Sequence, residues 1–267
     1  MWFSSWLRPW KRSEPGQHRP GRGATGQRAG FRPRLEALEN RTLRLGQTYV
    51  VHVAGDPVNQ FGCAVGSGTS GSLRYCIQQA NQPGNAGSTI VFDPSLKGRI
   101  ITLGGAELYI DNSMSIEGLG ANYLAISGGG GSRVFEVSAG VQVKLLGMTI
   151  ENGGGKETVN PTIATDNGIG GGILNYGTLT LSDCTLSGNS AGSRGGGIYN
   201  DGTLTLSGSI VTRNATGGGG EGGGIFNDIS GQLTILSSTV KGNKPQDLYN
   251  LGSWSADSSS LSGGLLC

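Results

Sequence analysis

The 267-residue chain is poor in charge, aromatic rings and cysteine. Charged side chains make up 14% of its residues and aromatic ones 6%, and it has only 4 Cys, 9 Pro and 2 His. Four cysteines without zinc-ligand spacing are too few for a disulfide scaffold. No apolar stretch approaches the ~18 residues that span a membrane. Residues 1–11 also lack the apolar core of a clear signal peptide.

Glycine is abundant instead, with 51 residues in the chain, where soluble proteins average about 7%. Each glycine inside a helix costs about 1 kcal/mol relative to alanine, which excludes a mostly helical protein. The glycines follow no strict three-residue period, and the few prolines also argue against collagen. Regular Leu, Ile and Val within the 35% hydrophobic fraction argue against wholesale disorder. A β-rich fold with many tight turns remains.

The formal net charge of +2 is distributed unevenly. Residues 1–46 hold ten Lys or Arg against three Glu, a net +7, and residues 47–267 hold ten bases against 15 acids, a net −5. We expect a disordered basic leader over 1–46 and one folded domain over 47–267. Residues 1–12, with Trp2, Trp6 and Trp10, are either a peripheral membrane contact or an unstructured export segment. We expect no nucleic-acid partner, because the folded part is acidic.

The second half of the chain repeats itself. Its first block occurs as Gly170-Gly-Gly-Ile-Leu-Asn175, Gly195-Gly-Gly-Ile-Tyr-Asn200 and Gly222-Gly-Gly-Ile-Phe-Asn227, with a degenerate copy ending at Asn250. Each complete copy leads to a second block of the type Thr178-Leu-Thr-Leu181. A third block ends at Asn189, Asn214 and Asn243. Val143–Leu145 aligns with the second block when residues 153–168 are treated as an insertion.

A period of 20–30 residues predicts a solenoid. Three short strands fit in each period and no helix does, so we expect an all-β parallel β-helix. In the second block the two-residue alternation of a strand directs Leu into the core and Thr outward. Asn tolerates left-handed backbone and can hydrogen bond between coils. We therefore predict structural ladders of Asn175, Asn200, Asn227 and Asn250, and of Asn189, Asn214 and Asn243.

Apolar residues at i, i+3, i+4 and i+7 predict one amphipathic helix at 72–81. An uncapped solenoid exposes apolar side chains and strand edges, and this helix is placed to cover the N-terminal end. Residues 251–267 are rich in Ser and Gly and predict no comparable C-terminal cap. We expect either that this tail folds over the last coil or that the chain is a short member of a longer type of solenoid.

The segments Gly71–Asn81, Thr89–Asp93 and Gly195–Leu206 resemble the right-handed parallel β-helix repeats of bacterial secreted and surface proteins. Those repeats have a pectate-lyase-like fold and are similar to polymorphic outer membrane protein repeats. The resemblance covers residues 47–267. Arg34–Arg41 resembles a short N-terminal element of such proteins, although Asn40 replaces its usual acidic residue. The resemblance implies a right-handed β-helix that is secreted or displayed on a bacterial cell surface.

Candidate chemical motifs are few. Gly66–Gly71 fits the dinucleotide pattern G-x-G-x-x-G, but chance produces such matches at this glycine content, and a loop before the helix is the better interpretation. Gly217–Ile225 departs from the calcium-binding nonapeptide, and Asp201 and Asp228 are expected in solvated turns. We therefore predict no metal, cofactor or catalytic residue.

Cysteine positions allow two structural predictions. Cys63 and Cys76 are close enough in sequence to form a disulfide, which the sequence does not decide. Cys184 occupies the position of Ser209 and Ser238 in later coils and is expected to be a buried free thiol.

An outward apolar stripe is the strongest candidate ligand surface. It consists of the residues between the inward Ile and the Asn of each first block, namely Leu174, Tyr199, Phe226 and Tyr249. Packing by a terminal tail and docking of a glycan or surface protein are both open interpretations. The sequence thus favours a structural or adhesive surface protein. The alternative is a carbohydrate-active enzyme, a polysaccharide lyase or glycoside hydrolase, on the same architecture.

Overall fold

The computed structural model describes residues 46–57, 64–104, 106–155 and 168–262. They belong to one compact unit, Thr42–Cys267. The second unit, Met1–Arg41, and with it nearly all of the expected basic leader, lies outside the described residues. Most of the expected insertion does too, because residues 156–167 are not described.

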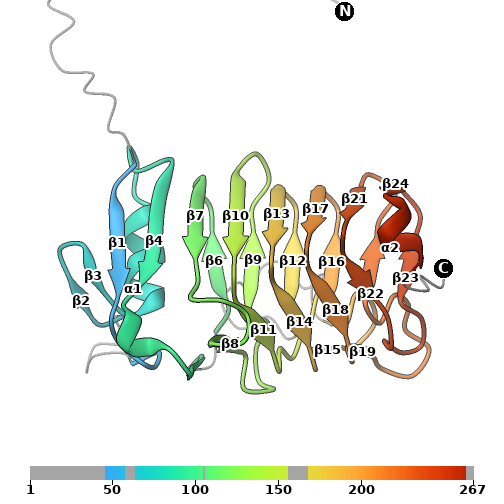
Figure 1. Cartoon of the computed structure of the whole chain (residues 1–267), viewed down its shortest axis with the longest axis horizontal. Helices are drawn as coiled ribbons and strands as arrows, with labels where there is room; N and C mark the ends of the chain where they lie inside the picture. Colours follow the sequence, from blue (N-terminus) through green and yellow to red (C-terminus); the bar gives the residue numbers. More distant parts are fainter. Residues whose placement is uncertain (1–45, 58–63, 105, 156–167, 263–267) are drawn as a thin grey trace, which may run out of the picture. The chain divides into compact units, whose positions relative to one another are not determined.

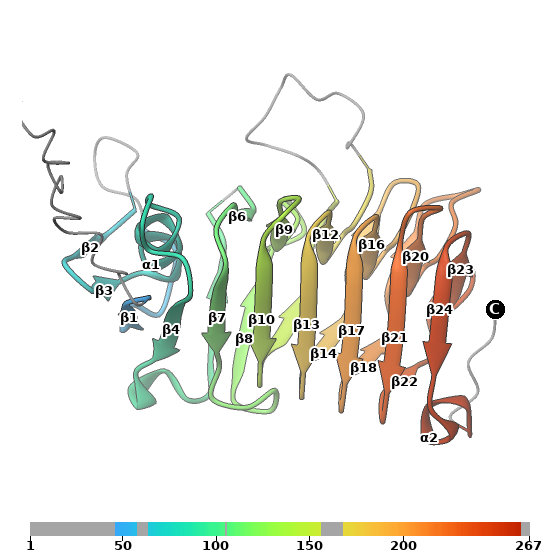
Figure 2. The same cartoon turned by 90° about the horizontal axis from the view of Figure 1, so that it is seen from above.

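The described chain winds through three parallel β-sheets whose strands stack side by side (Figures 1 and 2). The largest has ten strands, in the order β2-β3-β1-β4-β7-β10-β13-β17-β21-β24, all parallel except the β2–β3 pair. Its strands are β1 (Thr48–Val51), β2 (Gly66–Ser67), β3 (Ser70–Gly71), β4 (Ser88–Phe92), β7 (Met114–Glu117), β10 (Gln142–Leu146), β13 (Thr178–Ser182), β17 (Thr203–Ser207), β21 (Gln232–Leu236) and β24 (Ser253–Ala256).

The other two main sheets have six strands each. The first, called here the β5–β22 sheet, contains β5 (Arg99–Thr102), β8 (Leu124–Ser127), β11 (Thr149–Glu151), β14 (Thr185–Ser187), β18 (Ile210–Thr212) and β22 (Thr239–Val240). The second, the β6–β23 sheet, contains β6 (Leu108–Ile110), β9 (Phe135–Val137), β12 (Ile173–Asn175), β16 (Ile198–Asn200), β20 (Ile225–Asn227) and β23 (Leu248–Asn250). A small fourth sheet pairs β15 (Ser190–Ala191) with β19 (Ala215–Thr216).

Strand register follows the sequence repeat. Leu179 pairs with Leu204 and Leu204 with Leu233, so equivalent residues of successive coils lie side by side. Val143 pairs with Leu179, as the alignment across the insertion predicts. These side chains are fully or nearly fully buried in one continuous core. The described chain is therefore an all-β, β-helix-like solenoid with a repeating apolar interior.

Both predicted Asn ladders are present in the interior. In the first, each Nδ2 donates to the Oδ1 of the next Asn at 2.7 Å, from Asn175 through Asn200 and Asn227 to Asn250. In the second, Asn189 donates to Asn214 at 2.9 Å and Asn214 to Asn243 at 3.0 Å. A buried amide costs free energy unless it is hydrogen bonded, and a ladder satisfies its members coil by coil. The ladders therefore fix the turns between sheets.

Left-handed backbone does not coincide with the ladder Asn residues, contrary to the expectation from their tolerance of it. The positive φ angles fall one residue before the second ladder, at Gly188, Arg213 and Gly242. Another row begins the first block, at Gly170, Gly195 and Gly222. A ladder Asn must aim its amide along the stack, and the preceding residue makes the bend.

Helix α1 (Leu73–Ala80) has the predicted buried face of Leu73, Cys76, Ile77 and Ala80. The Ser72 hydroxyl caps it by accepting from the Tyr75 N–H. The helix contacts β1, β3, β4 and β6. The preceding Gly66–Gly71 segment forms the β2–β3 hairpin, a geometry unlike the strand-to-helix turn of a dinucleotide site.

The C-terminal part holds more structure than its Ser- and Gly-rich sequence predicts. Strand β24 adds to the ten-stranded sheet beside β21, and the short helix α2 (Ser258–Ser262) follows it. The Ser260 hydroxyl accepts from the Ser238 N–H at 3.1 Å. The backbone of β21 supplies the template for β24, so β24 needs few apolar residues of its own.

Candidate functional site

The predicted outward stripe is not exposed. Leu174 and Phe226 have no exposed surface and Tyr199 only 7%, and Tyr249 is half-buried. These side chains lie outside the main core. Together with Ile169 and Tyr176 they form a second buried cluster on the outer side of the β6–β23 sheet. We call it the covered cluster. The prediction of an open docking stripe was wrong, because the chain itself folds over these residues.

Glycine-rich segments are the cover. Ile169, Arg194 and Glu221 bridge to one another in parallel, one per coil, next to the glycines of the first block. A Cβ on Gly195 would lie 2.4 Å from the Ile198 carbonyl oxygen, and one on Gly222 2.4 Å from that of Ile225. Such distances leave no room for a side chain. The triple glycines therefore let the backbone return closely over the outward residues.

The rings inside the covered cluster stack in parallel. The centroids of Tyr199 and Phe226 lie 5.3 Å apart, and those of Phe226 and Tyr249 5.2 Å apart. The Arg194 guanidinium carbon lies 5.0 Å from the Phe226 centroid. This guanidinium is a cation on an aromatic face. The cluster is thus a stack of aromatic rings that the charged Arg194 side chain covers on one side.

The hydroxyls of Tyr199 and Tyr249 are both hydrogen bonded to carboxylates. Tyr199 donates to Asp228, and burial together with that bond raises the Tyr199 pKa. The hydrogen bond to Glu221 raises the Tyr249 pKa. Asp201 accepts from Ser230. Asp201 and Asp228, expected in solvated turns, are therefore half-buried and hydrogen bonded.

The outward face of the ten-stranded sheet is different: it carries a row of hydroxyl groups. One residue from each of eight paired strands contributes to this hydroxyl row, and seven of the eight are Thr or Ser. In stacking order they are Thr48, Thr89, Ser115, Lys144, Thr180, Thr205, Thr234 and Ser255. All are half-buried or exposed. Neighbouring strands lie about 4.8 Å apart, so the row repeats at that spacing along the solenoid.

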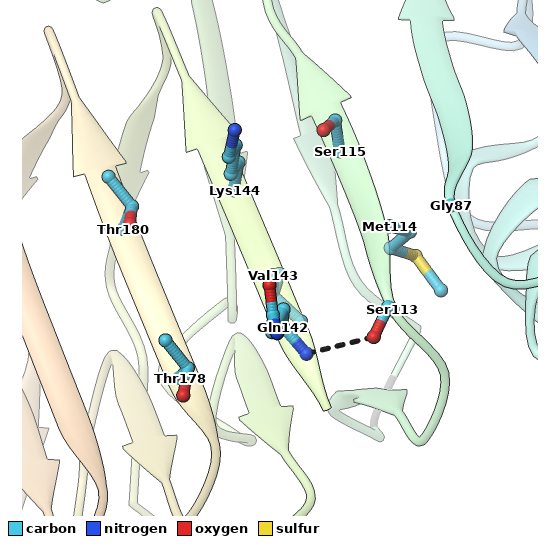
Figure 3. A pocket seen from close by; sticks show the side chains of 9 residues that line it. All are labelled: Gly87, Ser113, Met114, Ser115, Gln142, Val143, Lys144, Thr178 and Thr180. Atoms are coloured by element: carbon cyan, nitrogen blue, oxygen red, sulfur yellow. Dashed lines mark hydrogen bonds between the residues drawn. The ribbon is translucent and has the colours of Figure 1, made fainter. Parts of the chain in front are cut away.

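A shallow cavity of about 200 Å³ opens on this face (Figure 3). It lies over β7, β10 and β13, and Lys144 stands between Ser115 and Thr180. The Gln142 N–H donates to the Ser113 hydroxyl at 3.0 Å. The complete lining is Gly87, Ser113, Met114, Ser115, Gln142, Val143, Lys144, Thr178 and Thr180. Its polar groups are hydroxyls, one amide and one ammonium, beside the apolar Met114 and Val143.

Sequence reasoning singled out none of the cavity residues. Alternation places the Thr residues outward without marking them as a binding surface, and no motif includes Lys144. The sequence repeat could have identified Lys144, because the alignment of Val143–Leu145 with the second block pairs Lys144 with Thr180 and so places Lys144 in the hydroxyl row. The hollow itself depends on how neighbouring coils stack, which sequence does not report.

Two buried ion pairs, Arg74–Asp56 and Arg133–Glu136, were not predicted from the sequence. The Arg74 guanidinium donates to both Asp56 oxygens, the shortest contact being 2.6 Å. Arg133, with no exposed surface, donates to Glu136 at 2.8 Å and to the carbonyl of Gly170 at 3.1 Å. Both arginines also reach backbone oxygens near β6 or β12, so they act as structural ties between coils.

The described cysteines are buried free thiols. Burial raises the pKa of Cys76 to about 12 and that of Cys184 to about 11. Cys184 is as predicted, and its N–H donates to the Ser209 hydroxyl at 3.1 Å. Cys63, the proposed disulfide partner of Cys76, lies outside the described residues.

Over 46–57, 64–104, 106–155 and 168–262, no three His, Cys, Asp or Glu side chains gather as a metal site would require. No helix in this part of the chain has the length and hydropathy to cross a membrane.

No protein-family model matches the chain, and no curated protein and no solved structure matches it either.

Proposed function

We propose that this chain is an exported or cell-surface bacterial protein whose right-handed parallel β-helix is a rigid scaffold for glycan binding. In this proposal α1 caps the N-terminal end of the core. The observation that carries the proposal is the hydroxyl row on the ten-stranded sheet.

The chemistry of that face suits a sugar polymer. Hydroxyl groups donate and accept hydrogen bonds, as the hydroxyls of sugars do. Thr180 and Thr205 form no side-chain hydrogen bond among the described residues, and both are half-buried, so both hydroxyls are open to a ligand. Successive rings of an extended polysaccharide repeat on the same length scale as strands about 4.8 Å apart. One chain lying along the solenoid can therefore meet equivalent groups on successive coils.

Rigidity supports the same proposal. The Asn ladders and the fully buried core hold the strands in fixed register. A surface that needs no ordering loses less conformational entropy when it binds. The hydroxyl row is thus preorganised for a repeating ligand.

The test is binding of the full-length chain to a panel of extended polysaccharide fragments. A triple variant, Thr180→Val, Thr205→Val and Thr234→Val, keeps the shape and strand preference of each residue and removes only hydroxyls. We expect it to lose about tenfold or more in affinity for the best-bound glycan, since several hydrogen bonds are removed.

The matched control carries Thr185→Val, Thr212→Val and Thr239→Val on the β5–β22 sheet and should bind as the parent does. Equal binding by both triple variants would contradict the proposal. The panel is also scored for shortened products, and cleavage that the first triple variant abolishes would replace the binding proposal with an enzyme.

A further inference from the structure

Lys144 is the exception in the hydroxyl row. It pairs with Ser115 on β7 and Thr180 on β13, and its side chain is exposed. Among the described residues it is the only Lys or Arg on the outward face of the ten-stranded sheet, and it forms no ion pair there. Its charge is therefore available to a ligand.

The surroundings of Lys144 supply neutral donors. The cavity is lined by the hydroxyls of Ser115, Thr178 and Thr180 and by Gln142, and no carboxylate lines it (Figure 3). Glu117, on the same face, pairs with Leu146 and so lies diagonally from Lys144. Diagonal neighbours on a sheet are about 7–8 Å apart, a separation that long side chains can span, but Lys144 and Glu117 form no ion pair among the described residues. Lys144 is thus the one charged residue in the cavity lining, whose other polar side chains are hydroxyls and one amide.

We propose that this cavity binds a sulfate ester group of the glycan, with Lys144 as the charge that fixes the position of the chain along the hydroxyl row. The inference rests on the proposed glycan binding and adds the class of glycan. A sulfate ester presents three acceptor oxygens, which match the ammonium and the surrounding hydroxyls.

Other anions fit this cavity less well. Planar carboxylates are best matched by the fork of an arginine, whereas lysine is a point charge. A phosphate monoester carries about −1.5 to −2 charge at pH 7 and calls for more than one cation. A sulfate ester is a monoanion, and one Lys144 neutralises it. The single cation therefore selects the singly charged tetrahedral group.

The test compares three variants of the full-length chain on one polysaccharide in its sulfated and desulfated forms. Lys144→Thr gives the residue its neighbours in the row already have, and Lys144→Arg keeps the charge. Lys241→Thr removes the same charge from an exposed position outside the cavity. We expect Lys144→Thr to lose about tenfold in affinity for the sulfated form, the loss that one charge-assisted hydrogen bond gives. Lys144→Arg should lose less, and Lys241→Thr nothing.

Two further measurements separate this inference from the proposed function. The parent chain should bind the desulfated form more weakly, and the affinity that Lys144→Thr loses should be clearly smaller on the desulfated form than on the sulfated one. Preference for the sulfated form should shrink at high salt, which screens an exposed charge. If the sulfated and desulfated forms bind equally, or a carboxylated or phosphorylated glycan binds more tightly, the sulfate inference is wrong while glycan binding stands. If no glycan binds, the proposed function itself fails.

Discussion

Two outward faces of the same repeat differ in exposure: one is covered by the chain and the other is open to solvent. Outside the β6–β23 sheet, Leu174, Tyr199 and Phe226 are covered by returning glycine-rich chain. Outside the ten-stranded sheet, Thr180 and Thr205 remain at the surface. Both sets alternate with core residues in the same way, so periodicity assigns both to the outside. The difference teaches that an outward side chain is exposed only where no neighbouring segment folds back over it.

The largest effect is expected from opening the covered cluster at its centre. Phe226 has no exposed surface and stacks between two rings. Phe226→Ala should lower the free energy of unfolding by about 3–5 kcal/mol, because it removes a buried ring and leaves a cavity. Thr205→Val on the open face should change it by less than about 0.5 kcal/mol. Chemical denaturation of both variants measures the contrast, and similar losses would erase the distinction between the faces.

The next effect comes from the cover itself. A Cβ on Gly196 would lie 2.3 Å from the Ala215 carbonyl oxygen and 2.5 Å from that of Gly223. Gly196→Ala should therefore cost about 3 kcal/mol by forcing coils apart. Gly218 is exposed and has no atom within 4 Å of such a Cβ, so Gly218→Ala is the matched control and should be nearly neutral. A stable Gly196→Ala protein would show that the cover does not lie as closely as described.

A smaller loss of stability is expected from breaking the Asn ladder, which supports the coils that carry both faces. Asn200 links Asn175 to Asn227 and is fully buried. Asn200→Ala should destabilise the fold by about 2 kcal/mol, since it leaves buried amide groups of its neighbours without partners. Asn122→Ala, at an exposed turn position without left-handed backbone, serves as a comparison. Thermal unfolding of the two variants should separate them by several degrees. Equal midpoints would mean that the ladder contributes no stability.

Sequence was sufficient for the repeating elements. The Leu positions of the second block, the Asn ladders and the buried face of α1 follow from periods of 2, 3.6 and about 25 residues, and the structure has all of them. The β24 strand was not predictable, because its pairing with β21 supplies what its own sequence lacks. Burial of Arg133 depends on carbonyls of Ile169 and Gly170 that are distant in sequence.

The candidate site was predictable only in part. Alternation placed the Thr residues outward, but the same rule exposed the covered cluster wrongly. Three consecutive glycines mark a chain that can pass close to other atoms, and this was the available signal for the cover. Which surface it closes depends on the path of the turn. The cavity at Lys144 likewise arises from packing between coils.

We propose that glycan is bound by the open face of the ten-stranded sheet and not by the aromatic residues of the covered cluster. The most direct measurement compares glycan affinity of the parent chain, the Thr180→Val, Thr205→Val, Thr234→Val variant and Tyr249→Leu, which alters the half-buried end of the aromatic stack. We predict that the triple variant loses about tenfold or more and that Tyr249→Leu binds as the parent does. Loss of binding in Tyr249→Leu with full binding by the triple variant would contradict the account.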